Sequence, residues 1–584
     1  MKKHLTVLLC ICVFVTGLYG QVSSDIFDPF YEDVSIWEGA GLIHDAPFIR
    51  PYPLQEVKRL LNVVIEKGDM GQRRRAEEYY KRYFGRPLHF GGKAEIAVKA
   101  PKRQFELNIL PSMDVNFSLH NLLTVTGRIS AAVTNKLTHQ ALVPEFQYSK
   151  YDLADDSVHV GPFYLLPVFN TGVAVGTPHY YVTAGIARTS YGPFYENSLL
   201  VGSHAMHQGQ FSFVINHEKW TYNQAFLTLT ATDDAGGNRQ PGKFMMIHSL
   251  NIRPFSWLSF GIVDSIIYGK RFEPIYLIPF SAFFISQGLY DFPDNSLIGG
   301  TFTVKPIKNL RIDGVLYADD LGFNEIVKFK KDAKWRMSGQ FGLSYTMPKT
   351  HWFSFIDLNY TFITPYAYTH YDHHTISRPN YSNYTHNGVP FGSNLEPNSD
   401  RIQLRLKFRP LHGLDINFSN AFIRHANITE SVTDIAMLKD YVSKNYTTDG
   451  STLNHAAITE PRNDGSRYKD QAFLYSTPFM KQKTIQYVNQ LGLDVSCHLP
   501  IVKSGGYMLF KIGYTFEANI NPGVGKNIYR PNDRTKGWYE QSIKDIGGAA
   551  VIKDEADKQL ADWRSAARGK QFNHYIRLSA EFAY

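Results

Sequence analysis

Hydrophobic and polar residues alternate with a period of two along most of the chain, from about residue 92 onward. Over positions 401–409, every second residue is Ile, Leu or Phe, and the residues between them are Arg, Gln and Lys. The same alternation runs through 335–347 and 508–519. A period of two is that of a β-strand with one apolar face. These runs are about twice the usual strand length of soluble proteins, and they suit strands that cross a membrane at a tilt.

The connections between the predicted strands differ in length in a regular way. Short and long connections alternate, as in outer-membrane barrels, which have tight periplasmic turns and long external loops. The short ones are expected near 120–123, 175–179, 217–222, 254–257, 306–309, 347–351, 410–413 and 498–506. The long ones are expected at 135–162, 191–208, 234–242, 271–294, 320–334, 366–398, 429–484 and 521–570. We predict an all-β chain, a transmembrane antiparallel β-barrel of about 18 strands over residues 91–584.

The last predicted strand ends on aromatic residues. Ile576, Leu578, Ala580, Phe582 and Tyr584 lie on one face of the segment that closes the chain. An alternating apolar strand with a C-terminal aromatic residue resembles the signal by which outer-membrane barrels are recognised for insertion. We therefore expect this strand to bind the barrel-insertion machinery and the barrel to contact outer-membrane lipid.

The N-terminus has the features of an export signal. Lys2 and Lys3 precede an apolar segment at 5–18, and Gly20 offers a cleavage point. This order is typical of a signal peptide, here residues 1–20. After it, no uninterrupted apolar run approaches the ~18 residues of a transmembrane helix. The outer membrane of a diderm bacterium is the expected location.

Residues 21–90 follow a helical pattern. A cap and helix start are predicted at Asp28 and Pro29, a second start at Pro53, and a third, polar helix at 71–84. We predict a small N-terminal helical head that lies in the periplasm, in front of the barrel.

The composition excludes several classes of protein. An apolar content of 43% and an aromatic content of 14% exclude intrinsic disorder. Of three cysteines, Cys10 and Cys12 fall in the signal peptide, which leaves Cys497 and excludes a disulfide scaffold or a thiolate metal site. The net charge of +8 is spread without a basic tail, so no nucleic-acid partner is expected. We predict a monomer without cofactor or metal.

One predicted external loop is rich in tyrosine and histidine. Its tyrosines could stack on sugar rings and donate hydrogen bonds. Its histidines and acid could instead bind a metal ion, and a third interpretation is a solvated loop or an aromatic girdle at the membrane interface. The candidate sugar-binding residues are Tyr366, Tyr368, His370, Tyr371, Tyr381 and Tyr384. The alternative metal set is His370, Asp372, His373 and His374.

One strand carries a row of cations on its polar face, the basic ladder Arg401, Arg405, Lys407 and Arg409. Facing the lumen, these side chains could attract a carboxylated or phosphorylated polymer, which arginine binds with two parallel hydrogen bonds. They could also pair with acids across the interior, because buried charges need partners. The candidate partners are Asp313, Asp357 and Asp415.

Motifs of hydrolytic enzymes are not found. The sequence has neither a G-x-S-x-G nucleophile elbow nor an H-E-x-x-H helix. We therefore predict that the chain is not an enzyme.

Four segments, 31–61, 263–280, 294–304 and 310–320, carry a resemblance to a known family. The first contains GLIHDAPFIRPYPLQEV and the second reads VDSIIYGKRFEPIYLIPF. They resemble the Wzi-type capsule assembly proteins of the outer membrane. The resemblance implies a lectin-like barrel that binds or helps to assemble surface polysaccharide, either capsule or exopolysaccharide. A passive diffusion channel is the alternative, favoured by the polar lumen expected inside so large a ring.

Overall fold

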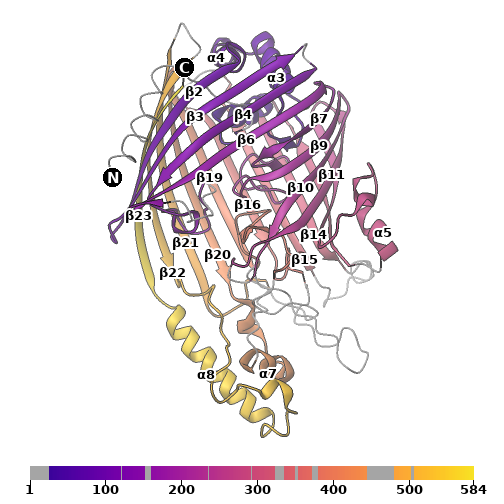
Figure 1. Cartoon of the computed structure of the whole chain (residues 1–584), viewed down its shortest axis with the longest axis vertical. Helices are drawn as coiled ribbons and strands as arrows, with labels where there is room; N and C mark the ends of the chain where they lie inside the picture. Colours follow the sequence, from indigo (N-terminus) through magenta and orange to yellow (C-terminus); the bar gives the residue numbers. More distant parts are fainter. Residues whose placement is uncertain are drawn as a thin grey trace.

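The computed structural model describes residues 25–119, 122–150, 159–233, 236–290, 293–321, 335–348, 353–370, 379–443, 479–501 and 506–583. The predicted signal peptide lies outside these residues. Eighteen antiparallel strands close into a barrel (Figure 1). They are β2 (Leu88–Ala100), β3 (Gln104–Leu119), β4 (Leu123–Thr134), β6 (Phe163–Thr177), β7 (Tyr180–Ala187), β9 (Gln208–His217), β10 (Trp220–Ala231), β11 (Gln240–Phe255), β12 (Leu258–Gly269), β13 (Asn295–Val304), β14 (Leu310–Leu321), β15 (Trp335–Thr346), β16 (Phe353–Ile363), β19 (Ser399–Leu411), β20 (Leu414–Ala426), β21 (Ile485–Ile501), β22 (Gly506–Ile520) and β23 (Lys570–Ala583). Each pairs with its neighbours in the chain, and β2 pairs with β23 to close the ring. The predicted fold class is confirmed.

The two ends of the barrel differ in the length of their connections. β19 and β20 are joined by His412 and Gly413 alone, whereas β16 and β19 are joined by residues 364–398. Gly413 has a φ of +79°, and a Cβ there would lie 2.3 Å from the carbonyl oxygen of His498, so this tight turn needs glycine. Short turns lie at the end where α4 packs, and long loops lie at the opposite end (Figure 1).

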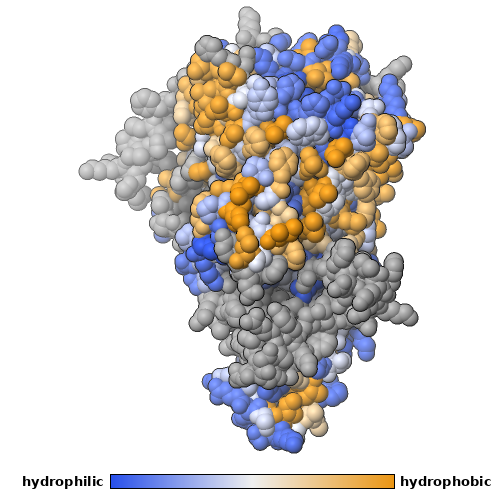
Figure 2. Space-filling view, turned by 90° about the vertical axis from the view of Figure 1, so that its right-hand side faces the viewer, coloured by the Kyte–Doolittle hydropathy of each residue, from blue (hydrophilic) through white to orange (hydrophobic). Residues whose placement is uncertain are grey.

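Side chains alternate between the lipid-facing wall and the lumen. In β19, Ile402 is 51% exposed on the outside, whereas Arg401 and Lys407 are each 3% exposed. Large exposed hydrophobic residues recur on the other strands in the same way, for example Ile129, Ile262 and Ile512, and hydrophobic residues spread over the wall in Figure 2. The strand period read from the sequence thus separates an apolar outer surface from a polar interior.

Three helices precede the barrel and form the head: α2 (Pro29–Gly39), α3 (Leu54–Lys67) and α4 (Met70–Phe84). The Asp28 side chain accepts a hydrogen bond from the Phe30 amide, and Pro29 opens α2, as the sequence predicts. The head has a hydrophobic core of its own, which includes Trp37, Leu60 and Tyr83. It is therefore a packed unit.

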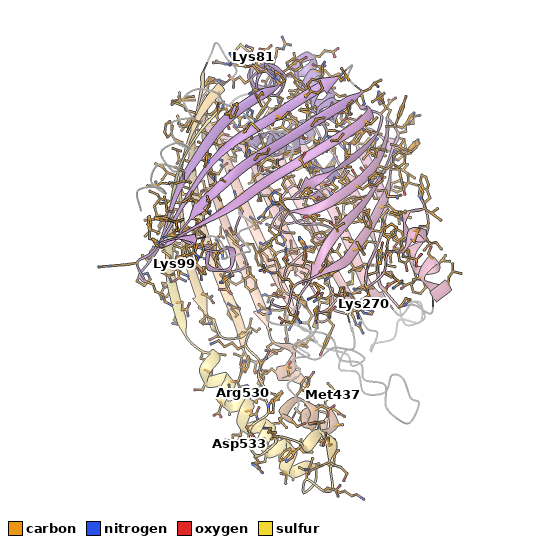
Figure 3. All side chains as sticks on the ribbon, viewed as in Figure 1. Lys81, Lys99, Lys270, Met437, Arg530 and Asp533 are labelled. Atoms are coloured by element: carbon orange, nitrogen blue, oxygen red, sulfur yellow. The ribbon has the colours of Figure 1, made fainter. Side chains whose placement is uncertain are left out.

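The long loops carry most of the remaining elements. Two of them form a module that extends away from the barrel and packs around Trp538 and Trp563 (Figure 1). We call this module, made of residues 427–443 and 521–569, the outer helical module. Lys81 on α4 and Arg530 in this module lie at opposite ends of the molecule (Figure 3). The loop elements are η1 (Thr138–Gln140), η2 (Pro274–Leu277), α5 (Phe283–Gln287), η3 (Gly288–Tyr290), η4 (Ile428–Ser431), α7 (Ile435–Ser443), η6 (Trp538–Glu540) and α8 (Ala549–Ala567). Within the described ranges, no helix has the length and apolar character needed to span a bilayer.

Two long loops fold back into the barrel and fill part of it. Residues 190–205, 364–370 and 379–395 contribute Tyr191, Leu200 and Phe391 to a hydrophobic core that also contains inward-facing residues of β9 to β14. Short strands stabilise these insertions: β1 (Ile49–Arg50) pairs with β8 (Ser190–Tyr191), and β17 (Thr385–His386) pairs with β18 (Val389–Pro390). A further short strand, β5 (His159–Val160), pairs with β6. One side of the lumen is thus packed with protein.

Candidate functional site

The head occupies the lumen at the short-turn end of the barrel. Its side chains and backbone groups are bound by residues from six strands spaced around the ring. These strand residues are Arg128 on β4, Asn216 on β9, Arg311 on β14, Thr346 on β15, Lys407 on β19 and Asp415 on β20. All of them except Arg128, which lies in the middle of β4, are within a few residues of the end of their strand. The head is therefore held from several sides, as a plug.

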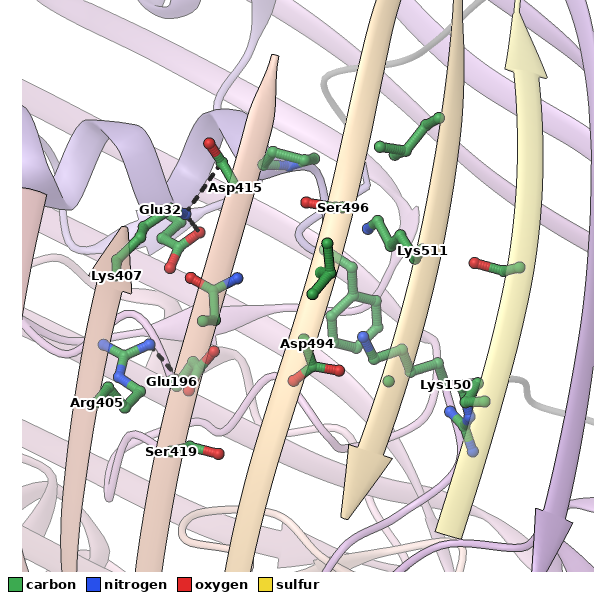
Figure 4. A pocket seen from close by; sticks show the side chains of 18 of the residues that line it. Glu32, Lys150, Glu196, Arg405, Lys407, Asp415, Ser419, Asp494, Ser496 and Lys511 are labelled. Carbon is green, nitrogen blue, oxygen red and sulfur yellow. Dashed lines mark hydrogen bonds and ion pairs between the residues drawn. The ribbon is translucent and has the colours of Figure 1, made fainter. Parts of the chain in front are cut away.

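Two cations of the basic ladder bind the head directly. Lys407 forms an ion pair with Glu32 on α2, and its Nζ lies 3.5 Å from Asp415. Arg409 forms an ion pair with Asp33 on α2, and its Nε lies 3.1 Å from Asp415. These contacts place the ladder against α2 (Figure 4).

The other two ladder residues bind groups of the wall and of an inserted loop. Arg405 pairs with Asp357 on β16 and with Glu196, both at 3.1 Å, and Arg401 donates to Asn394 Oδ1 at 2.6 Å. Asp357 and Asp415 are thus partners of the ladder, as one of the two sequence interpretations expects. Asp313, the third acid named there, lies 2.8 Å from Arg311 instead.

The acids of the head complete a buried charge network. Asp33 is 0% exposed and binds Arg409, Arg75 and the Tyr79 hydroxyl. Burial alone would raise the pKa of Asp33, but the guanidinium groups of Arg409 and Arg75 hold this pKa well below its usual range. The carboxylate is therefore charged whenever the head is docked.

The tyrosines of the loop 366–386 lie mostly inside the protein. Tyr366, Tyr368 and Tyr384 are at most 1% exposed. The Tyr368 hydroxyl lies 2.6 Å from Ser338 Oγ and donates to the Leu199 carbonyl, and its ring centroid lies 4.9 Å from that of Tyr384. These rings hold the inserted loops together. A contact between them and a sugar stays a prediction.

The other candidate residues of this loop are less buried or lie outside the described residues. His370 and Tyr381 are half-buried, and Lys270 lies 5.1 Å above the Tyr381 ring. Tyr371 falls in the range 371–378, which the structure does not describe, as do three members of the alternative metal set. Among the described side chains, no group of three histidine, cysteine or acidic residues is arranged to hold a metal ion.

A cavity of about 830 Å³ remains in the lumen beside the head. Its walls are α2 and α4, the inserted loops near residues 142–150 and 195–204, and the inner faces of β2 and β19–β23 (Figure 4). Cations line it on two sides: the ladder on one, and a second group from β2, β22, β23 and a loop on the other. The sequence analysis does not single out this second group, although Lys511 and Arg577 lie at alternate, polar positions of the last two strands.

Comparison with known proteins gives the fold but no family. No protein-family model and no curated protein matches this chain. The chain is similar to the structure of Wzi from Escherichia coli, described as an outer membrane protein involved in group 1 capsule assembly and as a carbohydrate-binding β-barrel. The TM-score is 0.51 at 12% identity, over 97% of this chain and 99% of Wzi. The outer membrane protein OprD from Pseudomonas aeruginosa matches with a TM-score of 0.38 at 10% identity, over 85% of this chain and 93% of OprD. The chain thus has the fold of an outer-membrane β-barrel.

Proposed function

We propose that this protein binds or helps to assemble surface polysaccharide at the outer membrane and that it does not act as an open diffusion channel. The observation that carries this proposal is the head, which is tied into the lumen by ion pairs to β14, β19 and β20. A channel needs a continuous aqueous path, and a plug bound from several sides of the lumen opposes one. The agreement with Wzi along almost the whole chain supports the same choice.

The orientation follows from the connections. Because outer-membrane barrels place short turns in the periplasm and long loops outside, the proposal puts the head in the periplasm and the outer helical module at the cell surface. Residues 1–20 would act as the export signal, and β23 would engage the insertion machinery. The protein would work as a monomer, without enzymatic activity.

A diffusion channel is the second candidate, and the lumenal cavity of about 830 Å³ is the observation that favours it. Single-channel recording in a planar bilayer separates the two. We expect no large, steady current from the intact protein, together with retention of polysaccharide on a glycan array. Large, steady open currents without glycan binding would contradict the first choice.

A further inference from the structure

A second group of cations lines the cavity on the wall opposite the ladder. Lys93 on β2, Lys511 on β22 and Arg577 on β23 belong to three adjacent strands, and Lys150 reaches the same cavity from the loop between β4 and β5. Figure 4 shows Lys150 and Lys511 in the pocket. These four residues, the lumenal cation cluster, come from distant parts of the sequence and meet only because the barrel closes.

The cluster has fewer anionic partners than the ladder. Glu95 lies 2.9 Å from Lys93 and 3.8 Å from Arg577. Within the part of the chain that the structure describes, neither Lys150 nor Lys511 forms an ion pair, and both side chains are exposed to the cavity. Lys407, by contrast, is 3% exposed and contacts two carboxylates, Glu32 and Asp415.

The charge balance of this wall is positive. Besides Glu95, the carboxylate that faces the cluster is Asp494 on β21, and the more distant Glu196 is held by Arg405. Four cations therefore face two carboxylates. Inside a low-dielectric wall, such an excess attracts anions more strongly than the same charges would on an open surface.

Small residues leave room beside the cations. Ser496 and Ser579 lie opposite Lys511 in the neighbouring strands, and Gly513 lies between Asp494 and Arg577. A Cβ at position 513 would approach Asp494 Oδ1 to 2.6 Å, so any larger residue would push the carboxylate into the cavity. The wall is thus recessed at the cluster, where a ligand group could enter.

We propose that the lumenal cation cluster is a subsite for the carboxylate groups of an acidic oligosaccharide. This inference rests on the proposed function and specifies its ligand class. Arg577 presents a planar fork of donors that matches a carboxylate, although one of its nitrogens also donates to the Leu142 carbonyl. Lys150, which lies 5.0 Å from the Phe27 ring, and Lys511 supply point charges that no carboxylate of the described residues pairs with. The ladder is excluded from this role because Arg405, Lys407 and Arg409 are already paired with carboxylates, and Arg401 is only 3% exposed.

Binding at this subsite should depend on pH. Burial inside the barrel lowers the pKa of Lys150 to about 8, and the nearby cations Lys511, Lys93 and Arg577 act in the same direction. Glu95 has the opposite, smaller effect on this pKa. Lys150 is therefore charged below pH 8 and loses its proton as the pH rises through this value. Affinity for an anion falls in the same direction, while a neutral sugar is unaffected.

The test compares two trisaccharides by calorimetry on the full-length protein in detergent. Trigalacturonate, which carries carboxylates, should bind, and maltotriose, which is neutral, should not. Affinity for trigalacturonate should fall with added salt and from pH 7 to pH 9. The double variant Lys150→Gln/Lys511→Gln should lose about tenfold or more in affinity. Neither lysine has an ion pair to lose, so the barrel should still fold, which heat-modifiable gel migration checks.

The control removes two charges elsewhere. Lys544→Gln/Lys553→Gln changes the outer helical module by the same charge and should bind trigalacturonate as the unmodified protein does. Equal affinity of the Lys150/Lys511 variant would overturn the subsite, as would equal binding of maltotriose or of inorganic phosphate. If the unmodified protein retains neutral glycans on an array but not trigalacturonate, the subsite fails and the proposed function stands. If it retains no glycan at all, both fail.

Discussion

Asp33 is the residue on which docking of the head depends most. It is fully buried and holds Arg75 and Arg409, one from the head and one from the barrel wall. Removing one partner of a buried ion pair costs about 3–5 kcal/mol, because the remaining charges stay buried without compensation. We expect Asp33→Asn to loosen the head, so that limited proteolysis cleaves it faster.

The pH dependence of this docking follows from the pKa of Asp33, which lies below its usual range because of Arg409 and Arg75. A carboxyl with a depressed pKa contributes stability above its unfolded pKa of about 3.9 and loses it as the pH falls through the folded value. The contribution of Asp33 to resistance against proteolysis should therefore be unchanged from pH 7 to pH 4.5. The control for Asp33→Asn is Asp69→Asn, at an exposed helix cap. If limited proteolysis cleaves the head equally fast in both variants, the prediction for Asp33→Asn is contradicted.

For individual residues, the sequence predicts which side chains face the lumen, but it identifies only some of the acids with which they form ion pairs. The period of two places Arg405 and Lys407 inside, and Asp357 and Asp415 lie close enough in neighbouring strands to be named. Glu32 could not be named, because it lies 375 residues from Lys407 and no local pattern joins them. Tyr368 shows the same limit, since aromatic residues suit a sugar-binding loop and a packed core equally well.

Among the elements, α2 and β19 form one of the contacts that hold the head in the lumen. Glu32→Lys places a cation against Lys407 and should release the head, which raises the conductance of the barrel in a planar bilayer. Adding Lys407→Glu restores an ion pair of reversed polarity and should lower the current again. The Lys407→Glu variant alone should conduct like Glu32→Lys. A current that the double variant does not reduce would show that this pair does not hold the plug.

The barrel strands can largely be predicted from the sequence, whereas the packing of the long loops inside the barrel cannot. Strand periodicity and turn lengths identify the barrel strands because each strand carries its own lipid-facing and lumen-facing sides. The loops 190–205 and 363–395 carry no such signal, because whether a loop extends outward or folds inward depends on the space that the finished ring encloses.

For the whole molecule, the continuous hydrogen-bonded ring predicts resistance to detergent. The mature protein should require detergent to stay in solution, migrate faster on a gel before heating than after it, and give a circular dichroism spectrum dominated by strands. A mature protein that remains monomeric and soluble without detergent would contradict the membrane location of the apolar wall.

The separation between Glu32 and its partner Lys407 also sets an order of events during biogenesis. The head carries its own hydrophobic core, built from residues 30–83, and among the described residues only Tyr195 packs against it from elsewhere, so it can fold without the barrel. Its anchors on β19 and β20 do not exist until some 400 residues of the chain have been made. A head that folds on its own can therefore be secured only when these two strands are in place.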